Sequence, residues 1–258
     1  MPPKLDLDLS SLARKIAISG PVKTLPTPRR VRILLNGVYI ADSTDALFVW
    51  EHPYYPQYYL PRGGFGDEYV KRREEITEGG EKVGWVLEVT VGERRVRGVE
   101  FEKGVVGGRV KIVFGDVDQW FEEDTPIYVH PKDPFKRVDI VHSTRPIKIS
   151  VGGVVIAETT SSMHLYETSL PVRYYMPLTA VDQSVLQPSE LKTKCPYKGE
   201  AEYYRVVLNG KEYGEVVWYY TRPTVECAAI QGLVCFYDEK VDVEVDGKTQ
   251  ERSKAALP

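Results

Sequence analysis

The segment Cys195-Pro-Tyr-Lys-Gly199 places a thiol and an amine in one short stretch of chain. The proline after Cys195 and the glycine after Lys198 favour a tight turn, which would hold both side chains in fixed directions. A lysine partly buried in such a turn would have a lowered pKa and could act as a base or Schiff-base nucleophile, or it could bind a carboxylate. The structural alternative is that Lys198 forms an ion pair with an acid such as Glu167 or Glu200.

Cys195 and His164 are further candidates for a catalytic group. Cys195 would have to act as a thiolate, and because no histidine lies near it in the sequence, the competing interpretation is a thiol that fills the core. His164 lies three residues before Glu167 on a predicted strand and is an acid/base candidate. An odd separation on a strand points side chains to opposite faces, so these two would cooperate only across a bulge.

Glu167 and Arg173 flank the segment that leads to the tyrosine pair Tyr174-Tyr175, so that Glu167 lies in an apolar, tyrosine-rich region. In such surroundings Glu167 is either a general acid/base with a raised pKa or the structural partner of Arg173. We expect a ligand to be held by Arg173 together with rings that can stack on it. The rings predicted to do so are Tyr175, Tyr197 and Trp218.

The four histidines show no spacing typical of a metal site. His130 and His142 lie on either side of Asp133 and Asp139, but no HxH or HxxxH pattern occurs. Three cysteines without a CxxC pair do not fit structural zinc. The sequence therefore predicts no metal and no cofactor.

The elements that would position these groups are mainly strands. The chain contains 21 glycines and 18 prolines, too many interruptions for long helices. Apolar and polar residues alternate with a period of two in residues 85–91, 110–114, 147–151, 203–208 and 241–245. Two-residue hairpin turns are predicted at Asn36-Gly37, Gly152-Gly153, Asn209-Gly210 and Asp246-Gly247.

One short helix is expected near the N-terminus, over residues 9–18. Ser10 and Ser11 are its candidate caps. Its apolar residues share one face at helical spacing: Leu9, Leu12, Ala13 and Ile16.

An internal repeat predicts two tandem copies of one domain. Residues 29–33 align with residues 145–149, and the same register aligns the tyrosine pair at 58–59 with that at 174–175. We therefore expect an all-β protein with two small antiparallel domains, each built as a barrel or tent of sheets. The predicted ranges are an N-terminal extension (1–26), the first repeat (27–124), a connector (125–144), the second repeat (145–249) and a tail (250–258).

The connector contains three prolines and is expected to be stiff, so that the copies hold a fixed orientation with a cleft between them. The copies themselves differ where chemistry is expected. Glu51 aligns with Glu167, but the first copy has Gln57 in place of Arg173, and its Arg62 aligns with a leucine. Glu51 and Arg62 are therefore candidate ligand-binding residues of a composite site, unless one copy works and the other is degraded.

Several segments resemble the DUF427 family, which is sometimes labelled nucleotidyltransferase-like. They lie at residues 130–139, 145–149, 153–157, 166–177, 195–201, 218–220 and 236–242. The resemblance implies one compact all-β domain per copy and a tandem arrangement, but no particular reaction. The label brings no motif, since the sequence has neither a Gly-Ser pair followed by spaced aspartates nor a phosphate-binding GxxxxGK[ST] loop.

Composition restricts the partners. The net charge of −3 gives no general affinity for nucleic acid or for anionic membranes. The apolar runs are far shorter than the roughly 20 residues of a membrane helix, and three cysteines are typical of a reducing compartment, so we expect a cytoplasmic protein. The expected partner is a small molecule, and the sequence does not indicate an oligomeric state.

Three functions fit these features. The first is a metal-independent enzyme that acts by acid/base chemistry on a small organic molecule, in a cleft of the second copy or between the copies. The second is a non-catalytic module that binds a small ligand, favoured by the lack of a recognisable nucleophile–base pair. The third is a protein-interaction scaffold, which an open convex patch of tyrosines would favour. The opposite charges around the Cys195–Gly199 turn favour the enzyme.

The absence of metal-ligand spacing generates the first testable prediction. Purified protein is expected to carry no stoichiometric zinc or iron, which elemental analysis would measure. About one equivalent of metal, removed only by a strong chelator, would contradict it.

Overall fold

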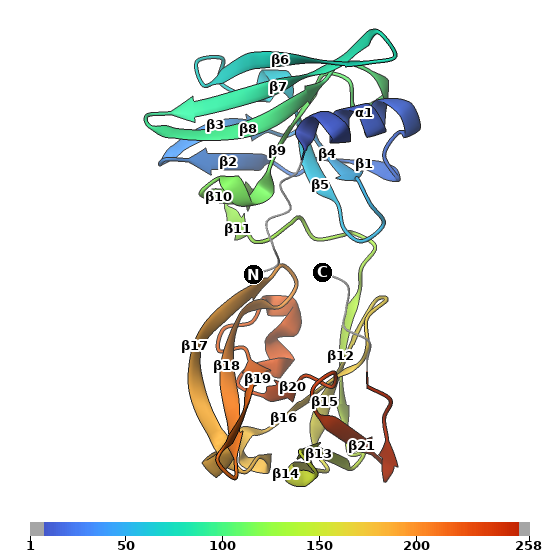
Figure 1. The fold of residues 1–258 in the computed structure, drawn as a ribbon, viewed down its shortest axis with the longest axis vertical. Coiled ribbons are helices and arrows are strands. Elements are labelled where there is room, and N and C mark those ends of the chain that lie inside the picture. Colours follow the sequence, from blue (N-terminus) through green and yellow to red (C-terminus); the bar gives the residue numbers. More distant parts are fainter. Residues whose placement is uncertain (1–7, 253–258) are drawn as a thin grey trace. The chain divides into compact units, whose positions relative to one another are not determined.

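The computed structural model describes residues 8–252, and the chain divides between Asp133 and Pro134 into two compact units (Figure 1). Each unit contains a seven-stranded and a four-stranded antiparallel sheet. The first unit also contains one α-helix, α1 (Leu9–Ser19).

The strands of the larger sheets follow the same order in both units, and those of the smaller sheets do so when one of the two is read from its other edge. In the first unit, the larger sheet runs β1 (Lys23–Thr27), β4 (Ala46–Trp50), β5 (Gln57–Pro61), β9 (Arg109–Ile112), β8 (Arg94–Phe101), β7 (Glu81–Val91), β6 (Val70–Glu78). Its smaller sheet runs β11 (Thr125–Ile127), β10 (Gln119–Glu122), β2 (Val31–Leu35), β3 (Val38–Ser43).

In the second unit, the larger sheet runs β12 (Val138–Ser143), β15 (Ser162–Glu167), β16 (Arg173–Met176), β20 (Val234–Phe236), β19 (Lys211–Tyr219), β18 (Gly199–Leu208), β17 (Leu186–Cys195). Its smaller sheet runs β14 (Val154–Thr159), β13 (Ile147–Val151), β21 (Asp242–Val245), β22 (Lys248–Thr249). The matching order confirms the tandem all-β fold predicted from the repeat. It also places Glu51, directly after β4, at the position of Glu167, which ends β15.

The first strand of each unit lies mostly or wholly outside the predicted repeat ranges. β1 lies largely in the predicted extension, and β12 lies in the predicted connector. Both are edge strands with a single hydrogen-bonded neighbour, so packing restricts their sequences less, and Pro26 is tolerated within β1. Aligning the two copies with each other therefore revealed the repeat only from the second strand of each unit onward.

All four predicted hairpin dipeptides join consecutive strands. Asn36 and Gly37 have φ angles of 48° and 75°, and Asn209 and Gly210 have 52° and 75°. A two-residue type I′ turn requires this left-handed conformation at both positions, which Asn-Gly adopts at little cost.

Helix α1 confirms the predicted helix but not its caps. Asp8 is the N-cap, and its carboxylate accepts a hydrogen bond from the backbone N–H of Ser10 at 3.0 Å. The predicted apolar stripe is buried, with Ile16 packed in one cluster with Tyr59 and Val99. The helix thus covers the face of the seven-stranded sheet that is turned away from the four-stranded sheet.

The same face is completed differently in the second unit. It carries the side chains of Tyr175, Tyr203 and Trp218, clustered with the buried Cys235. Within residues 134–252 no α-helix covers it, but a short 3₁₀ helix, η6 (Val225–Ile230), packs Cys227 and Ile230 into the same cluster and covers part of the face. This difference leaves room for a pocket.

Two isoleucines of α1 provide a matched test of this packing. Ile16 is 6% exposed and Ile18 is 68% exposed. We expect Ile16→Ala to lower the free energy of unfolding of the first unit by about 2–5 kcal/mol, because it removes buried methyl groups and leaves a cavity. Denaturant titration with hydrogen exchange at β7 and β8 measures the effect. Ile18→Ala is the control, and an equal loss from both variants would contradict this packing.

Candidate functional site

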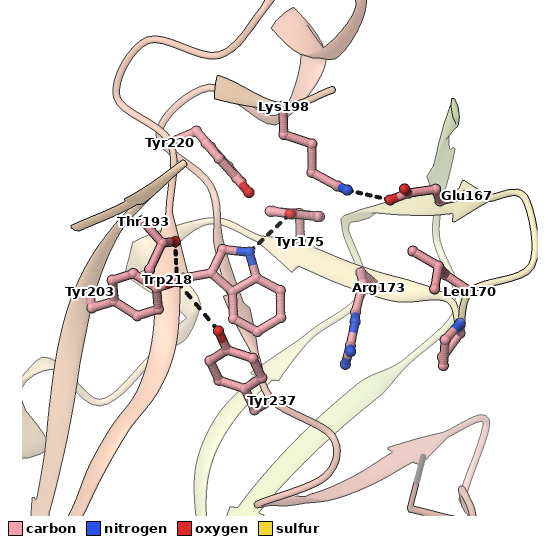
Figure 2. Close-up of a pocket in the computed structure, with 11 residues that line it drawn as sticks. Glu167, Leu170, Arg173, Tyr175, Thr193, Lys198, Tyr203, Trp218, Tyr220 and Tyr237 are labelled. Atoms are coloured by element: carbon pink, nitrogen blue, oxygen red, sulfur yellow. Dashed lines mark hydrogen bonds and ion pairs between the residues drawn. The ribbon is translucent and has the colours of Figure 1, made fainter. Parts of the chain in front are cut away.

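A pocket of about 220 Å³ lies on the aromatic face of the second unit (Figure 2). Leu170, Pro171 and Thr193 contribute to its lining, together with the charged side chains of Lys198, Glu167 and Arg173. The rest of the wall is aromatic: Tyr175, Tyr203, Trp218, Tyr220 and Tyr237. Apolar rings with a few charged groups are typical of small-molecule sites.

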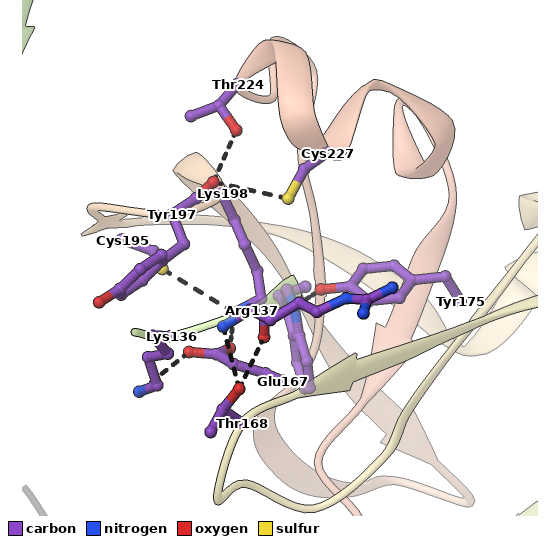
Figure 3. A network of polar contacts seen from close by, with 11 residues as sticks. Lys136, Arg137, Glu167, Thr168, Tyr175, Cys195, Tyr197, Lys198, Thr224 and Cys227 are labelled. Atoms are coloured by element: carbon purple, nitrogen blue, oxygen red, sulfur yellow. Dashed lines mark hydrogen bonds and ion pairs between the residues drawn. The ribbon is translucent and has the colours of Figure 1, made fainter. Parts of the chain in front are cut away.

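The predicted turn positions Lys198. Three residues join β17 to β18, with Cys195 paired to Gly199 across the hairpin. The segment after β19 fixes this turn, since the backbone N–H of Thr224 donates to the carbonyl oxygen of Lys198 at 3.0 Å. The hydroxyl of Thr224 also donates to the carbonyl oxygen of Tyr197 at 2.6 Å (Figure 3). Gly199 has a φ of 105°, and a Cβ there would lie 3.1 Å from the carbonyl oxygen of Arg222. Both features require glycine at this position.

Lys198 and Glu167 form a buried ion pair that opens onto the pocket. They are 9% and 7% exposed, and Lys198 Nζ contacts Glu167 Oε2. Glu167 Oε1 lies 3.2 Å from Nζ of a second lysine, Lys136. One carboxylate therefore serves two ammonium groups.

These contacts determine the charge of both groups. Burial raises the pKa of Glu167, but Lys198 and Lys136 lower it by more, so the net direction is down. Burial lowers the pKa of Lys198, but its electrostatic interactions with Cys195 and Glu167 raise it by more, so the net direction is up. Lys198 is an ammonium and Glu167 a carboxylate at neutral pH. A Schiff-base lysine needs a neutral amine and a general-acid glutamate needs a raised pKa, so the arrangement favours hydrogen-bond donation by Lys198.

Arg173 has other partners than the one considered from the sequence. Its guanidinium contacts Asp238 and lies 2.6 Å from Glu239 Oε1, so Glu167 is not its structural partner. It also lies 5.5 Å from the ring centroid of Trp218. Two carboxylates thus compensate its charge beside the aromatic wall.

Hydroxyl groups of Thr193 and of several tyrosines also line the pocket. Thr193 Oγ1 lies 2.7 Å from the hydroxyl of Tyr203, which lies 3.4 Å from that of Tyr237. Trp218 Nε1 donates to the hydroxyl of Tyr175 at 3.0 Å, and burial raises the pKa of Tyr175 well above its usual value. The hydroxyl of Tyr175 is therefore neutral at physiological pH, and all four hydroxyls can exchange hydrogen bonds with a ligand.

The family model described as a domain of unknown function, DUF427, matches residues 23–97 and 139–247. The chain belongs to the DUF427 family. Each matched range falls within one unit, which fits two tandem DUF427 copies. No curated protein matches the sequence closely enough to be reported as a relative.

Three of the predicted site residues lie in the second DUF427 copy but do not line the pocket. His164 lies on the opposite face of β15, 3.1 Å from Ser162 Oγ, and burial lowers its pKa. Cys195 Sγ lies 3.9 Å from Lys198 Nζ. The ring of Tyr197 packs against Lys136, whose Nζ is 5.3 Å from the ring centroid.

Glu51 and Arg62 belong to the first copy and have partners there. Lys111 contacts Glu51, and the hydroxyl of Tyr59 donates to Glu51 Oε1 at 3.2 Å. Arg62 Nη2 lies 2.9 Å from Asp67. Glu51 therefore repeats the buried ion pair of Glu167, with the ammonium supplied from strand β9.

Sequence reasoning missed several members of the site. Lys136 was assigned to the connector, yet it approaches Glu167 because β12 pairs with β15 and sets Val138 opposite Glu167. Asp238 and Glu239 approach Arg173 because β16 pairs with β20. The spacing of the repeat cannot reveal these contacts. The acidic pair Asp238-Glu239, inside the DUF427-like segment 236–242, was a sequence signal that could have indicated the partners of Arg173.

The described part of the chain contains neither a cluster of metal-ligating side chains nor a membrane-spanning helix. Within residues 8–252, no three side chains of His, Cys, Asp or Glu gather so that they could hold a metal ion. No helix in the same range is long and apolar enough to cross a membrane.

The ion pair predicts a pH-dependent effect of Glu167→Gln. Removing this carboxylate leaves the buried Lys198 without its counter-ion, so we expect a loss of about 3–5 kcal/mol in the free energy of unfolding at pH 7. Because the folded-state pKa of Glu167 is lowered, its contribution is complete above the unfolded value of 4.5 and disappears as the pH falls further. The gap between variant and wild type should therefore close in acid.

Denaturant titration at several pH values measures this gap. Glu200→Gln is the matched control, because Glu200 lies two residues after Lys198 on β18 with its side chain 45% exposed and should have little effect. A gap that stays constant from pH 7 to pH 3 would mean that Glu167 gains nothing from its ionised form.

Proposed function

We propose that the second DUF427 copy binds a small, flat organic molecule in this pocket. One observation carries the proposal: the sheet face that α1 covers in the first copy is only partly covered in the second, where a pocket lined by rings and charged groups lies on it. A volume of about 220 Å³ suits a ligand smaller than a typical drug-sized molecule.

The contacts suggest how the ligand is held. Trp218 and Tyr237, whose ring centroids are 4.4 Å apart, offer a surface on which a ring can stack. Lys198 offers hydrogen-bond donors at one end, and the hydroxyls of Thr193 and Tyr203 serve the other. A ligand with a flat apolar body and polar ends uses all three.

A metal-independent enzyme acting by acid/base chemistry is the second candidate. One feature favours it: the ammonium of Lys198 and the carboxylate of Glu167 face the same pocket. Lys198 would donate a proton or hydrogen bond to the substrate, and Glu167 would hold Lys198 in place. Turnover of a bound compound, followed by mass spectrometry, distinguishes this candidate from simple binding.

A scaffold function has less support: an open patch of tyrosines would favour it, but Tyr58 and Tyr59 are buried. We also propose a cytoplasmic location. Its support is that Cys195, Cys227 and Cys235 are free thiols, which suits a reducing compartment.

Trp218 provides a built-in probe of binding. The chain has four tryptophans, and Trp218 is the one in the second copy. Small aromatic fragments are expected to shift the NMR signal of the Trp218 indole N–H, assigned with Trp218→Phe, and to leave the signal of Trp120 in place. Tyr237→Ala should weaken binding roughly tenfold, because it removes one stacking ring.

The exposed Tyr166 serves as the matched control, since Tyr166→Ala removes a ring that is 43% exposed and outside the pocket. Fragments that bind without shifting the Trp218 signal would place their site elsewhere and contradict the proposal.

A further inference from the structure

The charges at the Lys198 end of the pocket do not balance. Glu167 Oε1 and Oε2 each contact a different ammonium group, that of Lys136 at 3.2 Å and that of Lys198. One negative charge therefore serves two positive charges, of which that of Lys198 is buried and that of Lys136 belongs to a side chain that is 20% exposed. Excess charge away from water is unfavourable unless a counter-ion joins it.

Lys198 is the ammonium that faces the empty volume. Its Nζ lies between Tyr220 and Glu167, above the ring of Tyr175 (Figure 2). An ammonium has three donors, and Lys198 uses one on Glu167 and directs one at Cys195 Sγ, 3.9 Å away. The third can serve a ligand.

The other cation of the pocket is not available in the same way. Arg173 contacts two carboxylates, Asp238 and Glu239, so an anion near it would meet their negative charge. An anionic group of the ligand would therefore turn toward Lys198.

We infer that the ligand is a small aromatic monocarboxylate, whose carboxylate accepts hydrogen bonds from Lys198 while its ring packs against Trp218. The inference rests on the proposed binding function and adds the charge and orientation of the ligand. A single negative charge neutralises the surplus of the Lys136–Glu167–Lys198 cluster. A dianion would overcompensate it, and a cation would meet two ammonium groups.

A series of probes of equal size tests the charge. Benzoate, benzamide and benzylamine share one ring and differ in the group attached to it. With the full chain at pH 7, titrations followed by the Trp218 indole signal should give a dissociation constant for benzoate at least about tenfold below that for benzamide, with benzylamine weakest.

Two lysine variants test the assigned contact. Lys198→Met should bring the dissociation constants of benzoate and benzamide together, because it removes the ammonium and keeps the chain length. Lys192→Met is the matched control on β17, where the side chain is 55% exposed, and should keep the preference for benzoate.

The other outcomes separate the inferred charge, the contact with Lys198 and the proposed binding site from one another. Benzamide binding as tightly as benzoate, with the Trp218 signal shifting for both, would overturn the inferred charge and leave the proposed binding site intact. A benzoate preference that survives in Lys198→Met would overturn the contact with Lys198. No shift of Trp218 with any of the three probes would overturn the proposed function and the inference together. The wild-type series does not depend on whether a variant folds.

Discussion

A buried glutamate at the end of the fourth strand of each copy governs how the rest of that copy is built. Glu51 and Glu167 are 8% and 7% exposed, and an isolated carboxylate at such a depth would be strongly unfavourable. Each copy therefore brings an ammonium to it. In the second copy Lys198 does so from the β17–β18 turn, although four strand spacings, about 19 Å in a flat sheet, separate β15 from β18. The contact requires a strongly curved sheet.

The source of the ammonium separates the two copies. In the first copy Lys111 reaches Glu51 from within the sheet, and aliphatic residues such as Val99 complete a face that α1 can cover. In the second copy Cys235 takes the place of Lys111 and Trp218 that of Val99, as the strand pairings show. A small thiol beside a large ring cannot supply the charge, so the ammonium comes from the β17–β18 turn, and the short helix η6 covers only part of the face.

The parts of this structure that local chemistry determines could be predicted from the sequence. Asn36-Gly37 and the other turn dipeptides define their hairpins because they tolerate left-handed backbone, and the alternation of β15 correctly separates His164 from Glu167. The turn at Cys195–Gly199 was predicted for the same reason. The contacts of Lys136 and of Asp238 could not be, since they depend on which strands become neighbours.

The sequence does not reveal the order of the strands, and this order also determines which surface α1 covers. An amphipathic stripe at Leu12 and Ile16 predicts that a helix buries one face, but not which sheet receives it. Only the pairing of β6, β7 and β8 creates the surface that α1 covers. The pocket in the second copy lies on the corresponding surface, which has no α-helix. Predicting the site would therefore have required the order of the strands, which the periodicity of the sequence does not reveal.

Stability alone gives little reason to keep the second ion pair. Replacing a buried pair with apolar residues of similar size is often neutral or stabilising by about 1–4 kcal/mol. In the first copy Glu51 and Lys111 are sealed within the fold, with Lys111 2% exposed, and Tyr59 adds a further hydrogen bond. In the second copy the pair borders a pocket, and its carboxylate is shared with a second ammonium group, that of Lys136. A group arranged in this way is poorly explained as a support for the fold and well explained as half of a contact that a ligand completes.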